Sequence, residues 1–152
     1  IMKLALLLLF SLSTLIFSTS IYAHCQVPCG IYDDSHRIIA ITEHSKTIEK
    51  AMNKIKSLSA ENDKNFNQII RWTNTKEEHA TKIQHIVSEY FMTQRLKPVS
   101  KKKGKGYDKL QLELELLHEI LFYAMKSKQT LDVTHTQKLR QSLANFKVSY
   151  NS

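Results

Sequence analysis

Glycine and proline are scarce in this chain, with three glycines and two prolines among 152 residues. Leu, Ile, Lys and Glu are common, no segment alternates convincingly between apolar and polar residues, and no internal repeat or low-complexity tract is present. A composition so poor in residues that interrupt helices indicates an α-helical protein and argues against a strand-built or repeat architecture. The length suits one domain.

Cysteine is almost absent too, since the chain has only Cys25 and Cys29. Two cysteines so close together cannot link distant parts of a fold. In an oxidising compartment they would form either a small-loop disulfide or a dithiolate that holds a metal, and both alternatives remain open from the spacing. Of seven histidines, only His24 adjoins a cysteine.

A long apolar run occurs only near the beginning of the chain. Lys3 precedes an apolar segment over residues 4–17, and a less hydrophobic stretch leads to Ala23. This order predicts that residues 1–23 are a signal peptide that is removed, and the apolar segment is short for a membrane span of about 20 residues. An uncleaved anchor is the alternative, which Ile21 favours because a small residue is more usual there.

Export would bring the mature chain to an oxidising compartment, with no stable membrane association after cleavage. A bacterial periplasm fits best, and a thylakoid lumen or an extracellular destination is also compatible.

The chain is basic, with a formal net charge of +8. Such a balance can indicate nucleic acid or an anionic membrane as a partner. Its lysines are dispersed, however, apart from a cluster at 101–105 that also contains Gly104. We therefore interpret the cluster as a solvated loop, predict no nucleic-acid partner, and note that a positive field also attracts small anions.

Apolar residues recur three and four positions apart in four segments, as in amphipathic helices. The first segment begins near Asp34 and ends near Leu58. Ser59 is expected to cap the second helix, and Pro98 is expected to end it. Asp132 or Thr134 is expected to cap the fourth helix. The four stripes contain Ile38, Ile41, Ser45, Ile48, Met52 and Ile55; Phe66, Ile69, Thr73, Ala80, Ile83, Val87 and Tyr90; Leu110, Leu112, Leu114, Leu116, Leu117, Leu121 and Ala124; and Leu139, Leu143, Phe146 and Tyr150.

The predicted fold class is therefore all-α, with an antiparallel up-and-down four-helix bundle over residues 33–152 and a metal-binding hook at residues 24–32. A helical bundle supports many functions, so the fold does not identify one.

The residues with the most distinctive chemistry begin at the expected cleavage site. Cleavage before His24 would expose an amine, with an ordinary pKa of about 7.7–8, beside an imidazole. Cys25 and Cys29 add two thiolates, and Pro28 and Gly30 suit a turn that brings them together. Nitrogen and sulfur donors arranged in a plane favour nickel or copper, whereas zinc prefers a tetrahedron.

Residues 24–33, HCQVPCGIYD, resemble the N-terminal nickel hook of nickel-containing superoxide dismutases, H-C-x-x-P-C-G-x-Y. Every fixed position of the motif matches. The family's subunit is a four-helix bundle, so the resemblance covers residues 24–152, although beyond the hook it depends on the helix pattern and on Glu89-Tyr90-Phe91.

The resemblance implies one nickel ion per subunit, bound by the His24 amine, the Cys25 backbone nitrogen and the thiolates of Cys25 and Cys29. The His24 imidazole would be an axial ligand in the oxidised state. The metal would alternate between Ni(III) and Ni(II), converting superoxide to dioxygen and hydrogen peroxide. Tyr32 would stand at the substrate entrance and Tyr90 would join it; as an alternative, both are packing aromatics.

The resemblance also implies a homohexamer. The sequence departs from the family at Gln26, where an acidic residue is common, and the residues that orient the axial imidazole are not evident. Glu43, Arg71 and His79 are candidates for that role. Two other functions use the same features: a copper or nickel chaperone with these ligands, and a secreted helical interaction module with an incidental disulfide.

Overall fold

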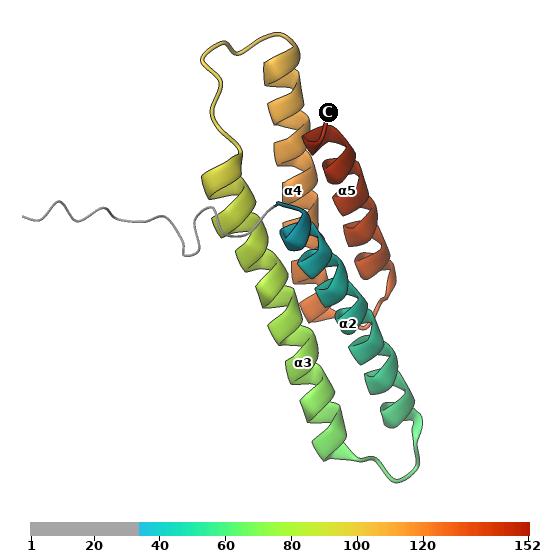
Figure 1. Ribbon diagram of the computed structural model, residues 1–152. Coiled ribbons are helices and arrows are strands. Elements are labelled where there is room, and N and C mark those ends of the chain that lie inside the picture. The colour runs from blue at the N-terminus through green and yellow to red at the C-terminus, as the bar shows by residue number, and fades with distance from the viewer. Residues whose placement is uncertain (1–33) are drawn as a thin grey trace, which may run out of the picture.

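The computed structural model describes residues 34–152, which form an antiparallel helical bundle (Figure 1). Its elements are α2 (Asp34–Ala60), α3 (Phe66–His85), the π-helical η1 (Ile86–Arg95), α4 (Lys105–Gln129) and α5 (Thr134–Tyr150). Because η1 continues α3, the described part of the chain contains four helices and no strand. The all-α bundle predicted from the sequence is confirmed, whereas its N-terminal hook lies outside the described residues.

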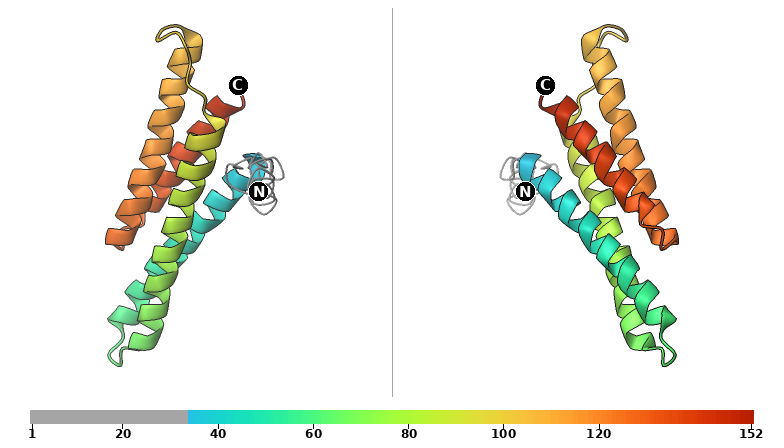
Figure 2. Two further views of the ribbon diagram at one scale, coloured as in Figure 1. Left: turned by 90° about the vertical axis from the view of Figure 1, so that its left-hand side faces the viewer. Right: turned by 90° about the vertical axis from the view of Figure 1, so that its right-hand side faces the viewer.

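The bundle consists of two helical hairpins that cross at an angle (Figure 2). One pairs α2 with α3 and the other pairs α4 with α5, while α3 also packs on α4 and α2 on α5. The α2–α3 turn and the η1–α4 loop lie at opposite ends of the molecule, and the two hairpins are offset along their length (Figure 1). Because of this offset, the first turn of α2 lies beside the last turns of α5 rather than at an end of the bundle.

The predicted apolar stripes form the core. Ile41, Ile48 and Met52 of α2, Leu117 of α4 and Phe146 of α5 are fully buried. Other members of the stripes, such as Leu114, Leu121 and Tyr150, are partly buried and pack against this core. Burying an aliphatic or aromatic side chain of this size stabilises the fold by about 1.5–3 kcal/mol relative to leaving it in water. No helix among residues 34–152 is long and apolar enough to cross a membrane.

Two details of the stripes were predicted wrongly. Phe66 is 67% exposed because it occupies the first turn of α3, at the end of the bundle that α4 and α5 do not reach (Figure 1). Leu112 is 47% exposed, since the α4 stripe is narrower than its leucine content suggests.

The residues that cap the helices also differ from the predicted ones. Ser59 does not cap the second helix, because α2 continues through Ala60. Asn65 caps α3 instead, its Oδ1 accepting a hydrogen bond from the Gln68 amide at 3.1 Å. At α5 the N-cap position is Val133 rather than Asp132 or Thr134, and it makes no side-chain cap hydrogen bond. Asp132, one position earlier, accepts a hydrogen bond at Oδ1 from the Thr134 amide at 2.9 Å.

A buried lysine ties α3 to the end of α4. The Lys76 side chain, 4% exposed, donates to the Ser127 carbonyl at 2.9 Å and to the Lys128 carbonyl, and forms an ion pair with Glu77 at 2.8 Å. The last carbonyls of a helix have no partners within the helix and carry partial negative charge, so an ammonium group there satisfies them.

Candidate functional site

The predicted metal ligands His24, Cys25 and Cys29, and the predicted entrance residue Tyr32, lie outside the described residues. The same holds for residues 1–23, the predicted signal peptide. Their proposed roles therefore remain predictions. The described chain begins at Asp34, two positions after Tyr32, and the contacts of Asp34 show what the bundle offers at the place where the hook joins it.

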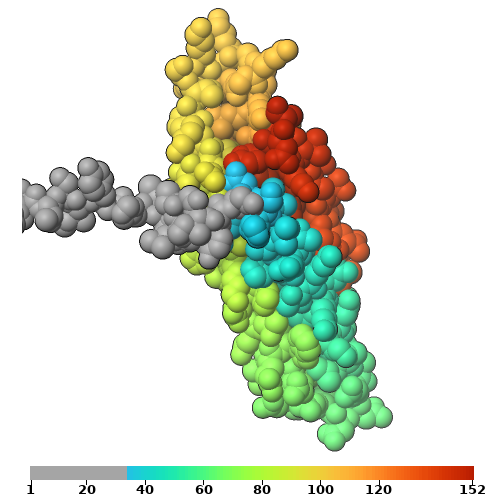
Figure 3. Space-filling view, in the orientation of Figure 1, coloured from blue at the N-terminus to red at the C-terminus, as the bar shows by residue number. Residues whose placement is uncertain are grey.

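Asp34, Tyr90, Arg95 and Tyr150 form one hydrogen-bonded group, called here the Asp34 cluster. The Tyr90 hydroxyl donates to Asp34 Oδ1 at 2.7 Å, and the Tyr150 hydroxyl donates to Oδ2 at 2.8 Å. Arg95 Nε donates to Asp34 Oδ1 at 2.7 Å, and Nη2 donates to the Tyr90 oxygen at 2.9 Å. The first residue of α2 is thereby fixed to both η1 and α5. On the face seen in Figure 3, the first turns of α2 indeed adjoin α5.

The π-helical geometry of η1 explains how Tyr90 and Arg95 meet. Hydrogen bonds there connect residues five apart, as between the Leu96 amide and the Phe91 carbonyl at 2.9 Å. The wider turn puts residues i and i+5 on the same side, whereas in an α-helix residues three and four apart are neighbours. Arg95 can therefore reach back to the Tyr90 hydroxyl, and its guanidinium carbon lies 5.0 Å from the ring centroid.

Aromatic packing supports the cluster from the core side. The Phe91 ring is fully buried and lies edge-on to the rings of Tyr90, Phe146 and Tyr150 at centroid distances of 5.2, 5.0 and 5.8 Å. Such contacts between aromatic rings contribute about 0.5–1.5 kcal/mol beyond burial. On the other side, the Arg37 guanidinium carbon lies 5.3 Å from the Tyr90 centroid.

The cluster holds a carboxylate in its charged form. Burial raises the pKa of Asp34, but hydrogen bonds from Tyr90, Tyr150 and Arg95, with the charge of Arg95, lower it below the ordinary value in sum. Burial, followed by the bond to Asp34, raises the pKa of both tyrosines. Both hydroxyls therefore keep their protons at neutral pH and donate them to Asp34.

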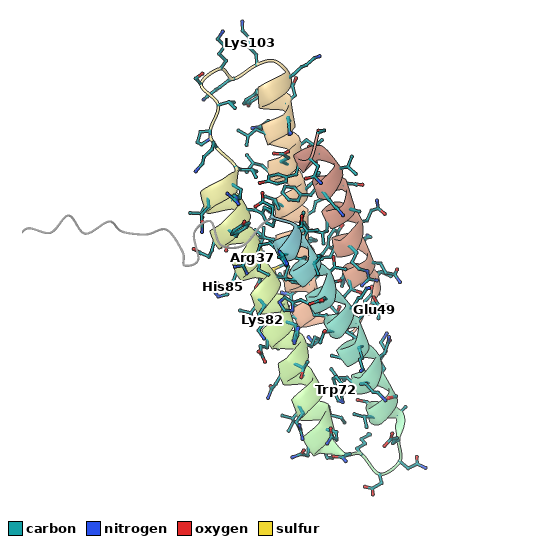
Figure 4. All side chains as sticks on the ribbon, viewed as in Figure 1. Arg37, Glu49, Trp72, Lys82, His85 and Lys103 are labelled. Atoms are coloured by element: carbon teal, nitrogen blue, oxygen red, sulfur yellow. The ribbon has the colours of Figure 1, made fainter. Side chains whose placement is uncertain are left out.

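The other predicted residues are not gathered at this place. Tyr90 belongs to the Asp34 cluster, but Glu43, Arg71 and His79 lie farther along α2 and α3. Arg71 and His79 are eight positions apart, which is about 12 Å along a helix. Trp72, the neighbour of Arg71, lies toward the α2–α3 turn, whereas Arg37 belongs to the beginning of α2, at the Asp34 cluster (Figure 4).

The sequence pattern does not predict that Asp34, Arg95 and Tyr150 act together at a site. It predicts only that Asp34 lies at the start of the first helix and that Tyr150 packs on the apolar face of the fourth. Asp34 is 56 to 116 positions from its three cluster partners in the sequence, and the Tyr90–Arg95 spacing of five matches no α-helical face. A π-helical segment is the local feature that would have indicated the contact between Tyr90 and Arg95, and the amino-acid composition does not reveal such a segment.

Within residues 34–152, no three or more His, Cys, Asp or Glu side chains gather as a metal site. An amine or imidazole nitrogen with two thiolates is chemically suited to nickel, which accepts nitrogen and sulfur donors.

A helical bundle preceded in the sequence by a histidine and two closely spaced cysteines has the features of a metalloprotein. A family model, that of nickel-containing superoxide dismutase, matches residues 19–152. The chain belongs to this family, and it is a nickel-dependent superoxide dismutase, an oxidoreductase. A search of curated proteins and a search of solved structures return no match.

Proposed function

We propose that the chain is exported, that removal of residues 1–23 exposes His24, and that superoxide is disproportionated at one nickel ion held by His24, Cys25 and Cys29. The observation that carries this proposal is that all six fixed residues of the hook motif stand directly before a bundle matched by the family model. When bound, nickel supplies one-electron chemistry by alternating between Ni(III) and Ni(II).

The roles of the chain's own residues follow from the chemistry of the donors. Thiolates from Cys25 and Cys29 donate electron density that favours the higher oxidation state, and the His24 amine binds the metal only after losing its proton. The His24 imidazole would be a further nitrogen ligand of the metal.

The Asp34 cluster supports a defined place for this site. Asp34 lies five positions after Cys29 along the chain, and such a segment spans at most about 18 Å. Because Asp34 is tied to η1 and α5, the residue at which the described bundle begins is fixed relative to both elements. Tyr90 then lies at the same place as the hook's attachment, which supports its proposed position with Tyr32 at the substrate entrance.

The assembly and compartment are part of the same proposal. A homohexamer would enclose the hooks at subunit contacts, and an oxidising compartment outside the cytoplasm, with a periplasm fitting best, would follow from export. Sedimentation of the protein purified from its native host, with N-terminal sequencing, tests both. A monomer, or a chain that starts elsewhere than at His24, would contradict the respective part.

The decisive test compares two chains released from a cleavable fusion, one starting at His24 and one retaining Ala23. We expect nickel binding and high superoxide dismutase activity only for the first, because a preceding peptide bond removes the free amine. Metal analysis and stopped-flow superoxide decay measure the two. Cys25→Ser and Cys29→Ser in the His24 chain should each abolish activity, and full activity of the Ala23-retaining chain would refute the proposal.

A further inference from the structure

Beyond the hook, His44 of α2 and His79 of α3 face each other across the hairpin. Their Nδ1 atoms are 3.0 Å apart, and their rings lie edge to face at a centroid distance of 4.8 Å and an interplanar angle of 78°. Both side chains are half-buried. We propose that this pair is a second metal site, which binds one Cu(II)- or Ni(II)-type divalent cation through both Nδ1 atoms, with water completing the coordination.

The separation of the two nitrogens selects the kind of ion. With metal–nitrogen bonds of about 2.0–2.1 Å, nitrogens 3.0 Å apart subtend roughly 91–97° at the metal. A tetrahedral ion requires about 109° and nitrogens about 3.3–3.4 Å apart. An angle near 90° is that of adjacent positions in square-planar or octahedral coordination, which suits copper and nickel better than zinc.

The pair is also in the protonation state that a metal needs. Burial, then the charges of His79 and Lys82, lowers the pKa of His44, while burial followed by the charge of Lys82 lowers that of His79. Both imidazoles are therefore neutral at neutral pH, and one donates its Nδ1 proton to the other. A cation would take the place of that shared Nδ1 proton, and the donating ring would exchange with water to become protonated on Nε2, as the accepting ring already is.

The charges around the pair come from three groups. Glu43 and Glu78 act favourably on a cation, whereas Lys82 opposes it. Lys82 is engaged with Glu78 at 2.6 Å, which offsets part of its charge. Since only two protein ligands are available, we expect weaker binding than at the hook, and the site is independent of the hook because it involves neither terminal amine nor thiolate.

The test uses the full processed chain with the hook disabled by His24→Ala, Cys25→Ser and Cys29→Ser, titrated with Cu²⁺, Ni²⁺ or Zn²⁺ by calorimetry. We expect one equivalent of Cu²⁺ or Ni²⁺ to bind more tightly than Zn²⁺. The Cu²⁺ form should show electron paramagnetic resonance couplings to two imidazole nitrogens. His44→Gln and His79→Gln should each abolish this equivalent, and His85→Gln, an exposed histidine on the same helix pair, should not change it.

Lys82→Ala should strengthen binding, because it removes an opposing charge and releases Glu78. Absence of Cu²⁺ and Ni²⁺ binding, or binding that survives both glutamine substitutions, would overturn the proposal.

Circular dichroism checks that each variant is folded. If a glutamine variant unfolds, the ring resonances of the hook-disabled parent decide instead. Selective broadening of His44 and His79 by Cu²⁺ supports the site, and uniform broadening of all histidines overturns it. Because the hook is disabled throughout, failure here leaves the proposed superoxide chemistry untouched.

Discussion

Asp34 is the residue through which the described bundle holds the start of its first helix. Its carboxylate accepts hydrogen bonds from two tyrosines and an arginine, and a negative charge in the first turn also interacts favourably with the helix dipole. We expect Asp34→Asn to lower the free energy of unfolding by about 1–2 kcal/mol, reduced from the value for fully buried charged bonds by the 30% exposure of this side chain. Urea denaturation measures the change, with the exposed Asp63→Asn as a control that should have little effect.

The same residue predicts a pH dependence. The pKa of Asp34 is lower in the folded chain than in the unfolded chain. Its contribution is therefore fully present above the unfolded pKa and is lost as the pH falls through the folded one. We expect the stability difference between the parent and Asp34→Asn to decrease as the pH falls below about 4, and to be lost once the pH has passed through the lower folded pKa. A difference that persists unchanged there would show that the carboxylate charge is not responsible.

Tyr32 and Tyr90 offer a second test at this scale. If Tyr32 gates the substrate, Tyr32→Phe should keep nickel bound and change turnover or product inhibition. Tyr90→Phe should in addition lower stability, because its hydroxyl bonds Asp34 and Arg95. Nickel content, superoxide kinetics across pH and thermal unfolding separate the two outcomes. Unchanged kinetics of Tyr32→Phe over the whole range would exclude a gate.

At the scale of the helices, Lys76 is the most consequential buried charge. Its ammonium group satisfies the last carbonyls of α4 from a position on α3. We expect Lys76→Met to destabilise the fold by about 1.5–3 kcal/mol, because charged hydrogen bonds are lost and buried carbonyls are left unsatisfied. The matched control is Lys82→Met on the same helix, where the ion pair with Glu78 is exposed and little change is expected. Equal effects in both variants would show that the contact with α4 is unimportant.

The helix pattern of the sequence predicted most of the elements correctly because burial repeats every three to four residues along each helix. The fully buried Ile41, Ile48 and Ala124 lie on the expected faces. The prediction that Phe66 is buried is wrong because periodicity does not reveal where a neighbouring helix ends. The π-helical form of η1 was not predicted because its residues conform to no α-helical face.

At the scale of the whole molecule, charge is the property that concerns an anionic substrate. The chain carries a net charge of +8. We expect kcat/KM for superoxide to fall as ionic strength rises, since salt screens charges over about 8 Å at physiological concentration. Stopped-flow decay over a salt series measures the slope, and a rate independent of salt would exclude steering.

The location of individual charges refines this expectation. Lys103 stands at the tip of the η1–α4 loop (Figure 4). Glu113 accepts a hydrogen bond from Ser149, the neighbour of Tyr150 in the Asp34 cluster. Because Glu113 is eight residues into α4, the loop is roughly 12 Å or more from Glu113 along the helix. Replacing Lys101, Lys102 and Lys103 by Gln should therefore change the salt slope less than Arg37→Gln, for which Arg37→Lys is the charge-conserving control.

The sequence by itself determined the helical class and the stripes that form the core, and it predicts the donor set at residues 24–29, because helix periodicity and the chemistry of His and Cys are local properties. The tertiary structure alone decided that Asp34 meets Tyr90, Arg95 and Tyr150, and that His44 meets His79. Those contacts join residues up to 116 positions apart, and they depend on how two hairpins cross and on the π-helical turn of η1, neither of which any short stretch of sequence encodes.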